Sequence, residues 1–119
     1  MEWKLEDSRP IWIQLWEQLA RRIATGAYPP GSRLPSVREL AAEAGVNPNT
    51  MQRALAQLEQ EGLCRADRTA GRLVTGDTQV IEAVRRREAE GVILQYLEGM
   101  AGLGYTREQA AELLKEECL

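Results

Sequence analysis

The feature that most constrains the fold is a pair of short helices predicted on either side of Gly45. Ser36 followed by Glu39 is a capping box, in which each side chain bonds the other residue's backbone N–H, and it begins the first helix. Asn47 is a good N-cap and Pro48 a good first residue for the second helix. Because Gly45 breaks the first helix immediately before this cap, the two helices are joined by a tight turn.

The elements around this pair predict a winged helix. Residues 10–25 have apolar side chains at helical spacing, and 33–34 can form a short strand. After the second helix of the pair, 63–66 and 72–75 can form a hairpin around 67–71. The order helix, strand, helix, helix, strand, strand is that of a winged helix, so we predict a mainly α domain with a small antiparallel β wing. The expected core consists of Trp12, Leu15, Leu19, Val37, Leu40, Leu55, Leu58 and Leu63.

The chain after Gly76 predicts a two-helix tail. Residues 78–103 form a long helical pattern, and Thr106 with Gln109 is a second capping box that opens a last helix. The apolar residues of the long helix occupy more than one face, which favours burial against a second copy. We therefore expect a DNA-binding domain over 1–76 and a dimerisation tail over 77–119. The apolar surface consists of Val92, Ile93, Tyr96, Leu97 and Met100, with Leu113 and Leu114 behind it.

Composition excludes several functional classes. No stretch of the 119 residues has the 18 or more consecutive apolar residues of a membrane span, and the first residues lack the pattern of a signal peptide, so we expect a cytoplasmic protein. Histidine is absent, and the two cysteines lie far apart. The usual general base and metal ligands are therefore missing, and we expect no enzyme activity, no metal and no cofactor.

The charge distribution is compatible with a nucleic-acid partner. The net charge of -3 argues mildly against DNA binding, because phosphate contacts come from Lys and Arg. Up to Asp77, however, ten basic residues balance ten acidic ones, and between Glu43 and Glu59 there is no acidic residue. The acidic excess lies entirely in the tail, where five basic residues face eight acidic ones. A DNA-facing helix can thus be locally cationic inside a neutral domain.

The second helix of the pair has a polar face that suits base recognition. Asn49, Gln52, Arg53 and Ala56 follow one another at helical spacing opposite the apolar stripe. Arg can bridge guanine O6 and N7, Asn and Gln can bridge adenine, and Ala leaves room for close approach. In a winged helix this element lies in the major groove. The alternative is a helix face that is simply solvated.

A spaced pattern over about residues 8–76 resembles one known family. Its parts are Pro10, Ile11, Trp12, Gln14, Gly26, Pro30, Gly31, Ser32, the run 34–41, Val46, Asn47, Asn49, Thr50, Leu58, Glu59, Glu61 and Gly62. In these residues the chain resembles the GntR family of bacterial transcription regulators. The short tail is similar to that of the YtrA-type subgroup, whose members lack a large ligand-binding domain, dimerise through the tail and commonly repress their own operon, often one that encodes an ABC transporter.

This resemblance implies roles for individual residues on a double-stranded DNA operator. Ser36 and Arg38 would contact the sugar-phosphate backbone, although Ser36 is also explained by capping alone and Arg38 by solvation. Asn47, Asn49 and Thr50 would meet phosphate or base at a helix N-terminus, where N–H groups favour an anion. Gln52 and Arg53 would read the groove. Whether a small-molecule effector releases the protein from DNA is left open by the sequence.

The wing departs from the family pattern. The family often has Arg-Gly-x-Gly-Thr, and this chain has Thr69 in place of the first Gly, followed by Gly71 and Arg72. A tip that needs a positive φ at Thr69 would be strained, so the loop is expected to differ in shape. Gly71 and Arg72 complete the predicted DNA-contacting residues, and for Arg72 a DNA contact and exposure to solvent remain open.

These observations predict a homodimeric repressor that binds a pseudo-palindromic operator. The rival interpretation is a protein-interaction module that uses the winged helix as a scaffold and does not bind DNA. The salt dependence of binding to duplex DNA distinguishes them, since counterion release makes DNA binding weaken steeply with salt.

Overall fold

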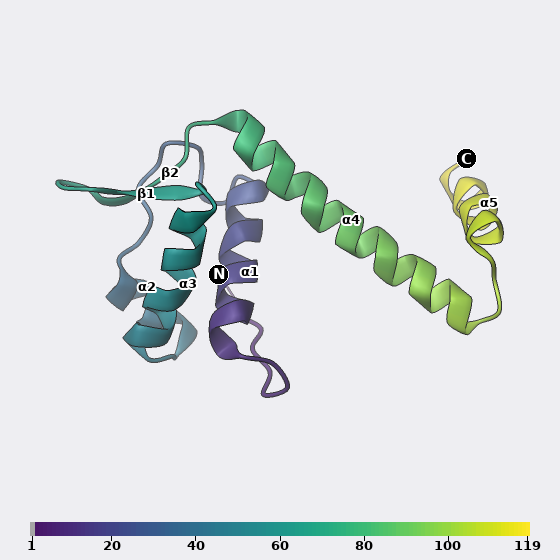
Figure 1. Cartoon of the computed structure of the whole chain (residues 1–119), viewed down its shortest axis with the longest axis horizontal. Coiled ribbons are helices and arrows are strands. Elements are labelled where there is room, and N and C mark those ends of the chain that lie inside the picture. Colours follow the sequence, from purple (N-terminus) through teal and green to yellow (C-terminus); the bar gives the residue numbers. More distant parts are fainter. Residues whose placement is uncertain (1) are drawn as a thin grey trace. The chain divides into compact units, whose positions relative to one another are not determined.

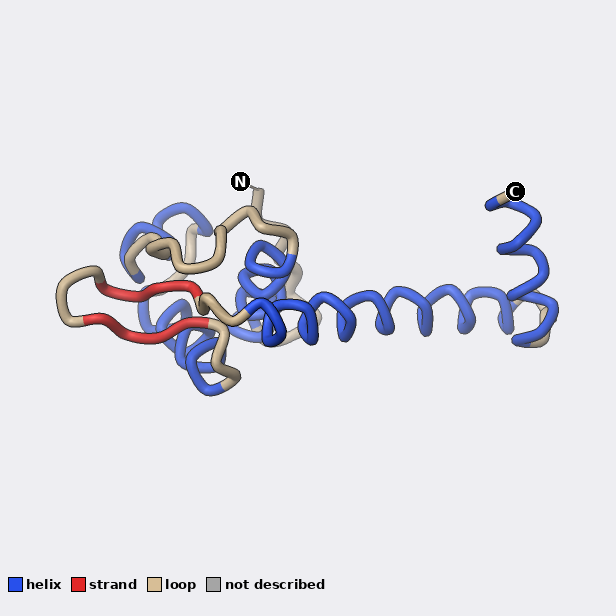
Figure 2. The backbone as a smooth tube through the Cα atoms, turned by 90° about the horizontal axis from the view of Figure 1, so that it is seen from above, coloured by secondary structure: helices blue, strands red, loops and turns tan. Residues whose placement is uncertain are grey.

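The structure is a computed structural model, and it describes residues 2–119. The described chain has five helices and one two-stranded sheet (Figures 1 and 2). The elements are α1 (Ile11–Ala24), α2 (Val37–Ala44), α3 (Pro48–Gln60), β1 (Cys64–Asp67), β2 (Gly71–Val74), α4 (Thr78–Gly102) and α5 (Arg107–Cys118). The predicted order of elements and the mainly α winged-helix class are confirmed. Contacts divide the chain into two compact units, 1–85 and 86–119.

The core of the first unit is built around α3, which contacts α1, α2 and β1. Each helix buries one stripe, as the apolar spacing predicts. The fully buried large side chains include Leu15, Leu19, Leu40, Met51, Leu55, Leu58 and Leu63. Two of the expected core residues, Trp12 and Val37, are only half-buried, and each lies in the first turn of its helix.

The turn between α2 and α3 forms through the predicted local hydrogen bonds. The Ser36 hydroxyl accepts from the Glu39 N–H at 3.1 Å, and the Glu39 carboxylate accepts from the Ser36 N–H at 3.2 Å. These bonds lower the pKa of Glu39 below its ordinary value. Gly45 ends α2 in the left-handed region with φ 70, and the Asn47 side chain caps α3 by accepting from the Asn49 N–H at 2.8 Å. The sequence thus specifies both helix ends that define the turn.

The wing is an antiparallel hairpin with Cys64 opposite Val74 and Asp67 opposite Gly71. On its other side β2 meets the predicted short strand, which is a single bridge between Arg33 and Leu73. Thr69 has none of the backbone strain that a positive φ would cause, since no described residue other than glycine has a positive φ. Instead the Asp67 carboxylate accepts from the Thr69 N–H, the Thr69 hydroxyl and the Ala70 N–H at 2.8 to 2.9 Å, which lowers its pKa.

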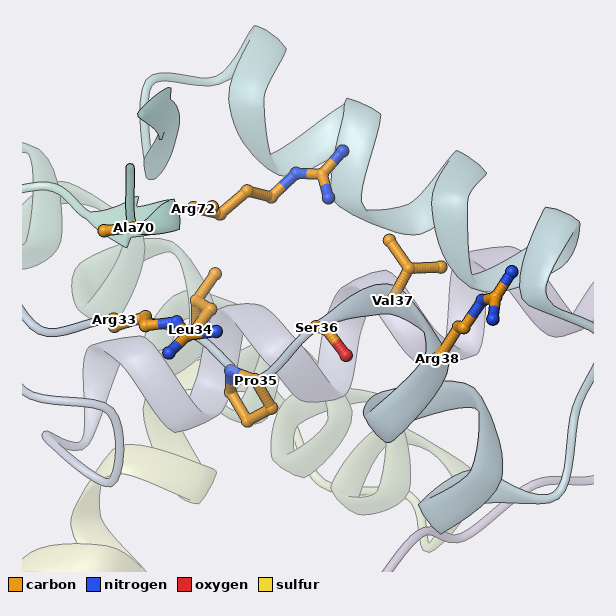
Figure 3. A pocket seen from close by; sticks show the side chains of 9 residues that line it. Arg33, Leu34, Pro35, Ser36, Val37, Arg38, Ala70 and Arg72 are labelled. Carbon is orange, nitrogen blue, oxygen red and sulfur yellow. The ribbon is translucent and has the colours of Figure 1, made fainter. Parts of the chain in front are cut away.

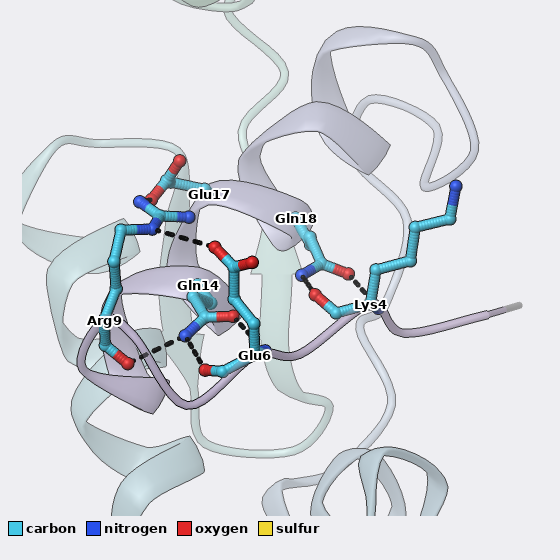
Figure 4. Close-up of polar contacts among 6 residues, drawn as sticks. All are labelled: Lys4, Glu6, Arg9, Gln14, Glu17 and Gln18. Atoms are coloured by element: carbon cyan, nitrogen blue, oxygen red, sulfur yellow. Dashed lines mark hydrogen bonds and ion pairs between the residues drawn. The ribbon is translucent and has the colours of Figure 1, made fainter.

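The segment before α1 is tied to that helix by two glutamine side chains (Figure 4). The buried Gln14 amide donates to the Glu6 and Arg9 carbonyls at 2.7 and 2.8 Å and accepts from the Glu6 N–H at 2.8 Å. Gln18 makes the same two-way contact with the backbone of Lys4. Each amide thereby replaces the strand partner that this extended segment lacks.

Helix α4 belongs to both units. Val80, Ile81 and Val84 in its first turns pack against the core of the first unit. The contacts therefore divide the chain after Arg85, inside α4, and not at the expected Gly76 boundary. The helical pattern continues through the whole of α4, so the sequence alone does not show where the helix stops packing against the first unit.

The second unit consists of the remainder of α4 and of α5. The predicted capping box is present, with the Thr106 hydroxyl accepting from the Gln109 N–H at 3.1 Å and the Gln109 side chain accepting from the Thr106 N–H at 2.9 Å. The Tyr96 hydroxyl donates to the carbonyl of Ala110 at 2.6 Å and joins the two helices. Within residues 2–119, no helix is long and apolar enough to cross a membrane.

Candidate nucleic-acid interface

The polar face of α3 is exposed, as predicted. Asn49, Gln52, Arg53 and Ala56 are all exposed, while Met51, Ala54, Leu55 and Leu58 on the opposite side are buried. Burial of the apolar stripe fixes the rotation of α3 about its axis. The four predicted residues are therefore presented together on the outer surface of the first unit.

The N-terminus of α3 uses only part of its polar capacity for capping. The Asn47 side chain accepts one hydrogen bond through its carbonyl oxygen, which leaves its NH2 group as a donor toward a ligand. Thr50 is half-buried beside it. The Asn47 NH2 group and the Thr50 hydroxyl are donors suited to an anion such as a phosphate. The backbone N–H groups of the first turn are already used, because Pro48 has none and those of Asn49 and Thr50 donate to the side chain and the carbonyl of Asn47.

A second set of predicted residues lines one groove between the start of α2 and the wing (Figure 3). The groove has a volume of about 300 Å³. Ser36 and Arg38 lie on one side and Arg72 on the other. Gly71, at the start of β2, also lines the groove. Arg33 also lines the groove, although no motif in the sequence predicted it. Its only sequence signal was its place in the short strand beside the wing.

The Arg72 side chain is not simply solvated, which was one of the two possibilities that the sequence left open. Its guanidinium forms an ion pair with the Glu59 carboxylate at 2.5 Å, and its side chain is only 19% exposed. Since Glu59 lies in the last turns of α3, this pair joins the wing to α3. The carboxylate neutralises much of the charge that a phosphate contact would use.

Arg53 is held by an aromatic ring. Its guanidinium carbon lies 4.2 Å from the centroid of the Trp12 ring, at the start of α1. A cation over the face of an indole is attracted by the ring quadrupole. The apolar stripe of α1 predicted that Trp12 lies in the core. Helical spacing does not reveal that the first residue of a stripe faces an arginine of another helix.

A third arginine, Arg22, has a structural role inside the first unit. It is buried, lies 4.0 Å from the centroid of the Trp3 ring, and donates to the Tyr28 hydroxyl at 2.9 Å and to Glu43 at 3.3 Å. It therefore joins the N-terminal segment, α1 and α2.

Cys64 is also buried, which raises the pKa of its thiol to about 11 and disfavours the reactive thiolate.

Comparison with known proteins agrees with this geometry. A family model described as "Bacterial regulatory proteins, gntR family" matches residues 14–74. The uncharacterized helix-turn-helix transcriptional regulator YhcF of Bacillus subtilis is 30% identical over 115 residues, which cover 97% of this chain and 95% of the relative. The helix-turn-helix transcriptional repressor YtrA of the same organism is 40% identical over 68 residues, covering 57% of this chain and 52% of YtrA.

The fold is also similar to solved structures. A GntR family transcriptional regulator from Listeria monocytogenes superposes with a TM-score of 0.83 at 35% identity, covering 94% of this chain and 98% of that protein. The similarity thus includes the tail as well as the winged helix. The matched region of the family model contains all nine predicted DNA-contacting residues, from Ser36 to Arg72.

Proposed function

Since the chain belongs to the gntR family of bacterial regulatory proteins, we propose that it is a homodimeric repressor that binds a pseudo-palindromic operator in duplex DNA. It is a transcription regulator with a DNA-binding domain and not an enzyme. The observation that carries the proposal is the exposed polar face of α3 beside the groove lined by Arg33, Ser36 and Arg38. DNA binding would place its action in the cytoplasm.

The chemistry of the two surfaces assigns them different tasks on DNA. The groove offers guanidinium and hydroxyl donors, which suit phosphate oxygens and set the position of the protein. The α3 face offers Asn49, Gln52 and Arg53, whose side chains can recognise base edges in the major groove. Ser36 keeps its hydroxyl hydrogen for a phosphate, because capping uses only its oxygen as an acceptor.

The second unit supports the dimeric part of the proposal. Val92, Ile93 and Leu94 are 51 to 55% exposed on α4, and Leu103 and Leu114 are further exposed apolar residues of this unit. Exposed apolar area of this kind is characteristic of association surfaces. Two copies joined here would present two α3 helices, and the operator would then have two related half-sites. The relative YtrA is a transcriptional repressor, which supports repression as the outcome.

Selection from a random duplex library at physiological salt tests the proposal most directly. The expected result is a two-fold symmetric motif whose affinity falls steeply with salt through counterion release. Electrophoretic mobility measured with each half-site alone shows whether both are needed. The proposal would be contradicted if no motif were recovered and duplex binding were absent or insensitive to salt. That result would favour the protein-interaction module. The genes controlled, including any ABC transporter operon, follow from where the motif occurs.

A further inference from the structure

Two arginines of the proposed interface are held in chemically opposite ways. Arg72 is ion-paired with Glu59 at 2.5 Å, whereas the Arg53 guanidinium carbon lies 4.2 Å from the centroid of the Trp12 ring. A carboxylate neutralises a guanidinium and accepts hydrogen bonds from its N–H groups. An indole face attracts the cation and uses none of its donors in this way.

Arg53 therefore keeps its hydrogen-bonding capacity while its position is restricted. The side chain is exposed, and within residues 2–119 no group accepts a hydrogen bond or forms an ion pair with it. The other tryptophan–arginine stack of the first unit is different. Arg22 beside Trp3 is 8% exposed, and Tyr28, Glu43 and the carbonyl of Glu2 accept hydrogen bonds from it.

We propose that Trp12 is a positioning residue for DNA recognition, because it holds the Arg53 guanidinium beside α3 with its charge and donors available. The inference rests on the proposed function. A long arginine side chain loses rotamer freedom when it binds, and a ring that restricts it beforehand lowers that cost. The ligand is a pair of neighbouring acceptor atoms on DNA, which either the guanine O6 and N7 edge or two phosphate oxygens provide.

Substitutions of Trp12 separate the ring face from apolar bulk. Trp12→Leu keeps an apolar side chain but removes the ring, and it should weaken binding to the selected operator about two- to fivefold, the range that an exposed cation–π contact supports. Trp12→Phe keeps a ring face and should retain most of the wild-type affinity. Trp3→Leu removes the structural stack on Arg22 and is the matched control, with operator affinity unchanged below its melting temperature.

A double-mutant cycle tests whether Trp12 acts through Arg53. The full-length chain, Trp12→Leu, Arg53→Leu and the double variant are titrated with the selected operator and with a scrambled duplex of equal length. In the Arg53→Leu background, Trp12→Leu should have no further effect. If a base edge is the ligand, only the operator loses affinity and one base preference per half-site relaxes. If phosphate is the ligand, both duplexes lose affinity equally.

A measurement without DNA tests the stack itself. The NMR signal of the Arg53 Nε–H should show a ring-current shift that disappears in Trp12→Leu and persists in Trp12→Phe, while circular dichroism melting reports the folded fraction. Unchanged operator affinity in Trp12→Leu, or an equal loss with and without Arg53, would overturn this inference alone. A wild-type chain that binds no duplex would overturn the proposed function and this inference with it.

Discussion

The two units of the chain satisfy their apolar residues in different ways. In the first unit, α1, α2, α3 and the wing enclose a continuous buried cluster. In the second unit, Ala110 is buried, while Val92, Ile93 and Leu94 remain more than half exposed. A unit with a closed core has the means to fold alone, whereas a unit that leaves its apolar surface open depends on a partner for stability. The comparison predicts that folding and assembly can be disturbed separately.

Separation of the two units should have the largest effect. A chain that ends after Arg85 keeps Val80, Ile81 and Val84 on the core, so we expect it to fold as a monomer. Its operator affinity should fall by roughly 10² to 10⁴ while its half-site preference is unchanged, because the tethering of two recognition helices is lost. Sedimentation and DNA titration measure both quantities. A truncated chain that stays dimeric at micromolar concentration would place the interface in the first unit.

A second, shorter truncation tests where the first unit ends. A chain that ends at Gly76 lacks the three apolar side chains of α4 and exposes the core beneath them. It should melt at a lower temperature than the chain that ends after Arg85. Equal melting temperatures would support the boundary expected from the sequence.

Matched leucine substitutions should affect the two units unequally. Leu55→Ala removes a side chain that is 0% exposed and should lower the free energy of unfolding of the first unit by about 2 to 5 kcal/mol. Leu94→Ala, at a residue that is 51% exposed, should leave that free energy unchanged and weaken dimerisation instead. All three tryptophans, Trp3, Trp12 and Trp16, lie in the first unit, so their fluorescence reports its unfolding selectively.

Arginine substitutions should show that DNA recognition belongs to the first unit. Arg53→Ala should cost about 1 to 3 kcal/mol of operator binding and relax one base preference, and Arg38→Ala should weaken all sequences alike and lower the salt slope by about one unit. Arg86→Ala is the control, because Arg86 is exposed beside Glu90 in the tail and should not alter binding. Equal losses of specific and non-specific binding in Arg53→Ala would contradict base recognition.

The smallest expected effect is a pH dependence confined to the wing. Hydrogen bonds from Thr69 and Ala70 lower the pKa of Asp67 below its ordinary value of 3.8. A lowered pKa in the folded state means that the ionised carboxylate stabilises the turn above about pH 3.8, and this contribution is lost as the pH falls through the folded pKa. Amide exchange at Thr69 and Ala70 should accelerate there. Asp67→Asn should exchange faster already at neutral pH, and an unchanged rate would refute the role of this carboxylate.

Local chemistry allowed the sequence to predict the helix ends and the order of elements. The caps at Ser36, Asn47 and Thr106 form between residues two or three positions apart, so their presence depends on neighbouring residues and little else. The polar face of α3 followed from helical periodicity in the same way. The family resemblance, including the YtrA-like relatives, was also readable from spaced residues and is confirmed.

Tertiary structure alone decided the partners of the arginines and the extent of each unit. Arg72 pairs with Glu59 across 13 positions, and Arg53 meets a tryptophan of a different helix. Neither contact could be predicted from the sequence. Many side chains of suitable charge are present, and only the packing of the elements determines which two side chains come into contact. The same reason explains why the unit boundary inside α4 could not be predicted. The helical pattern is uniform, but the start of α4 packs on the core of the first unit and the remainder belongs to the second unit. Periodicity specifies a helix and its apolar face, whereas the three-dimensional arrangement determines what that face meets.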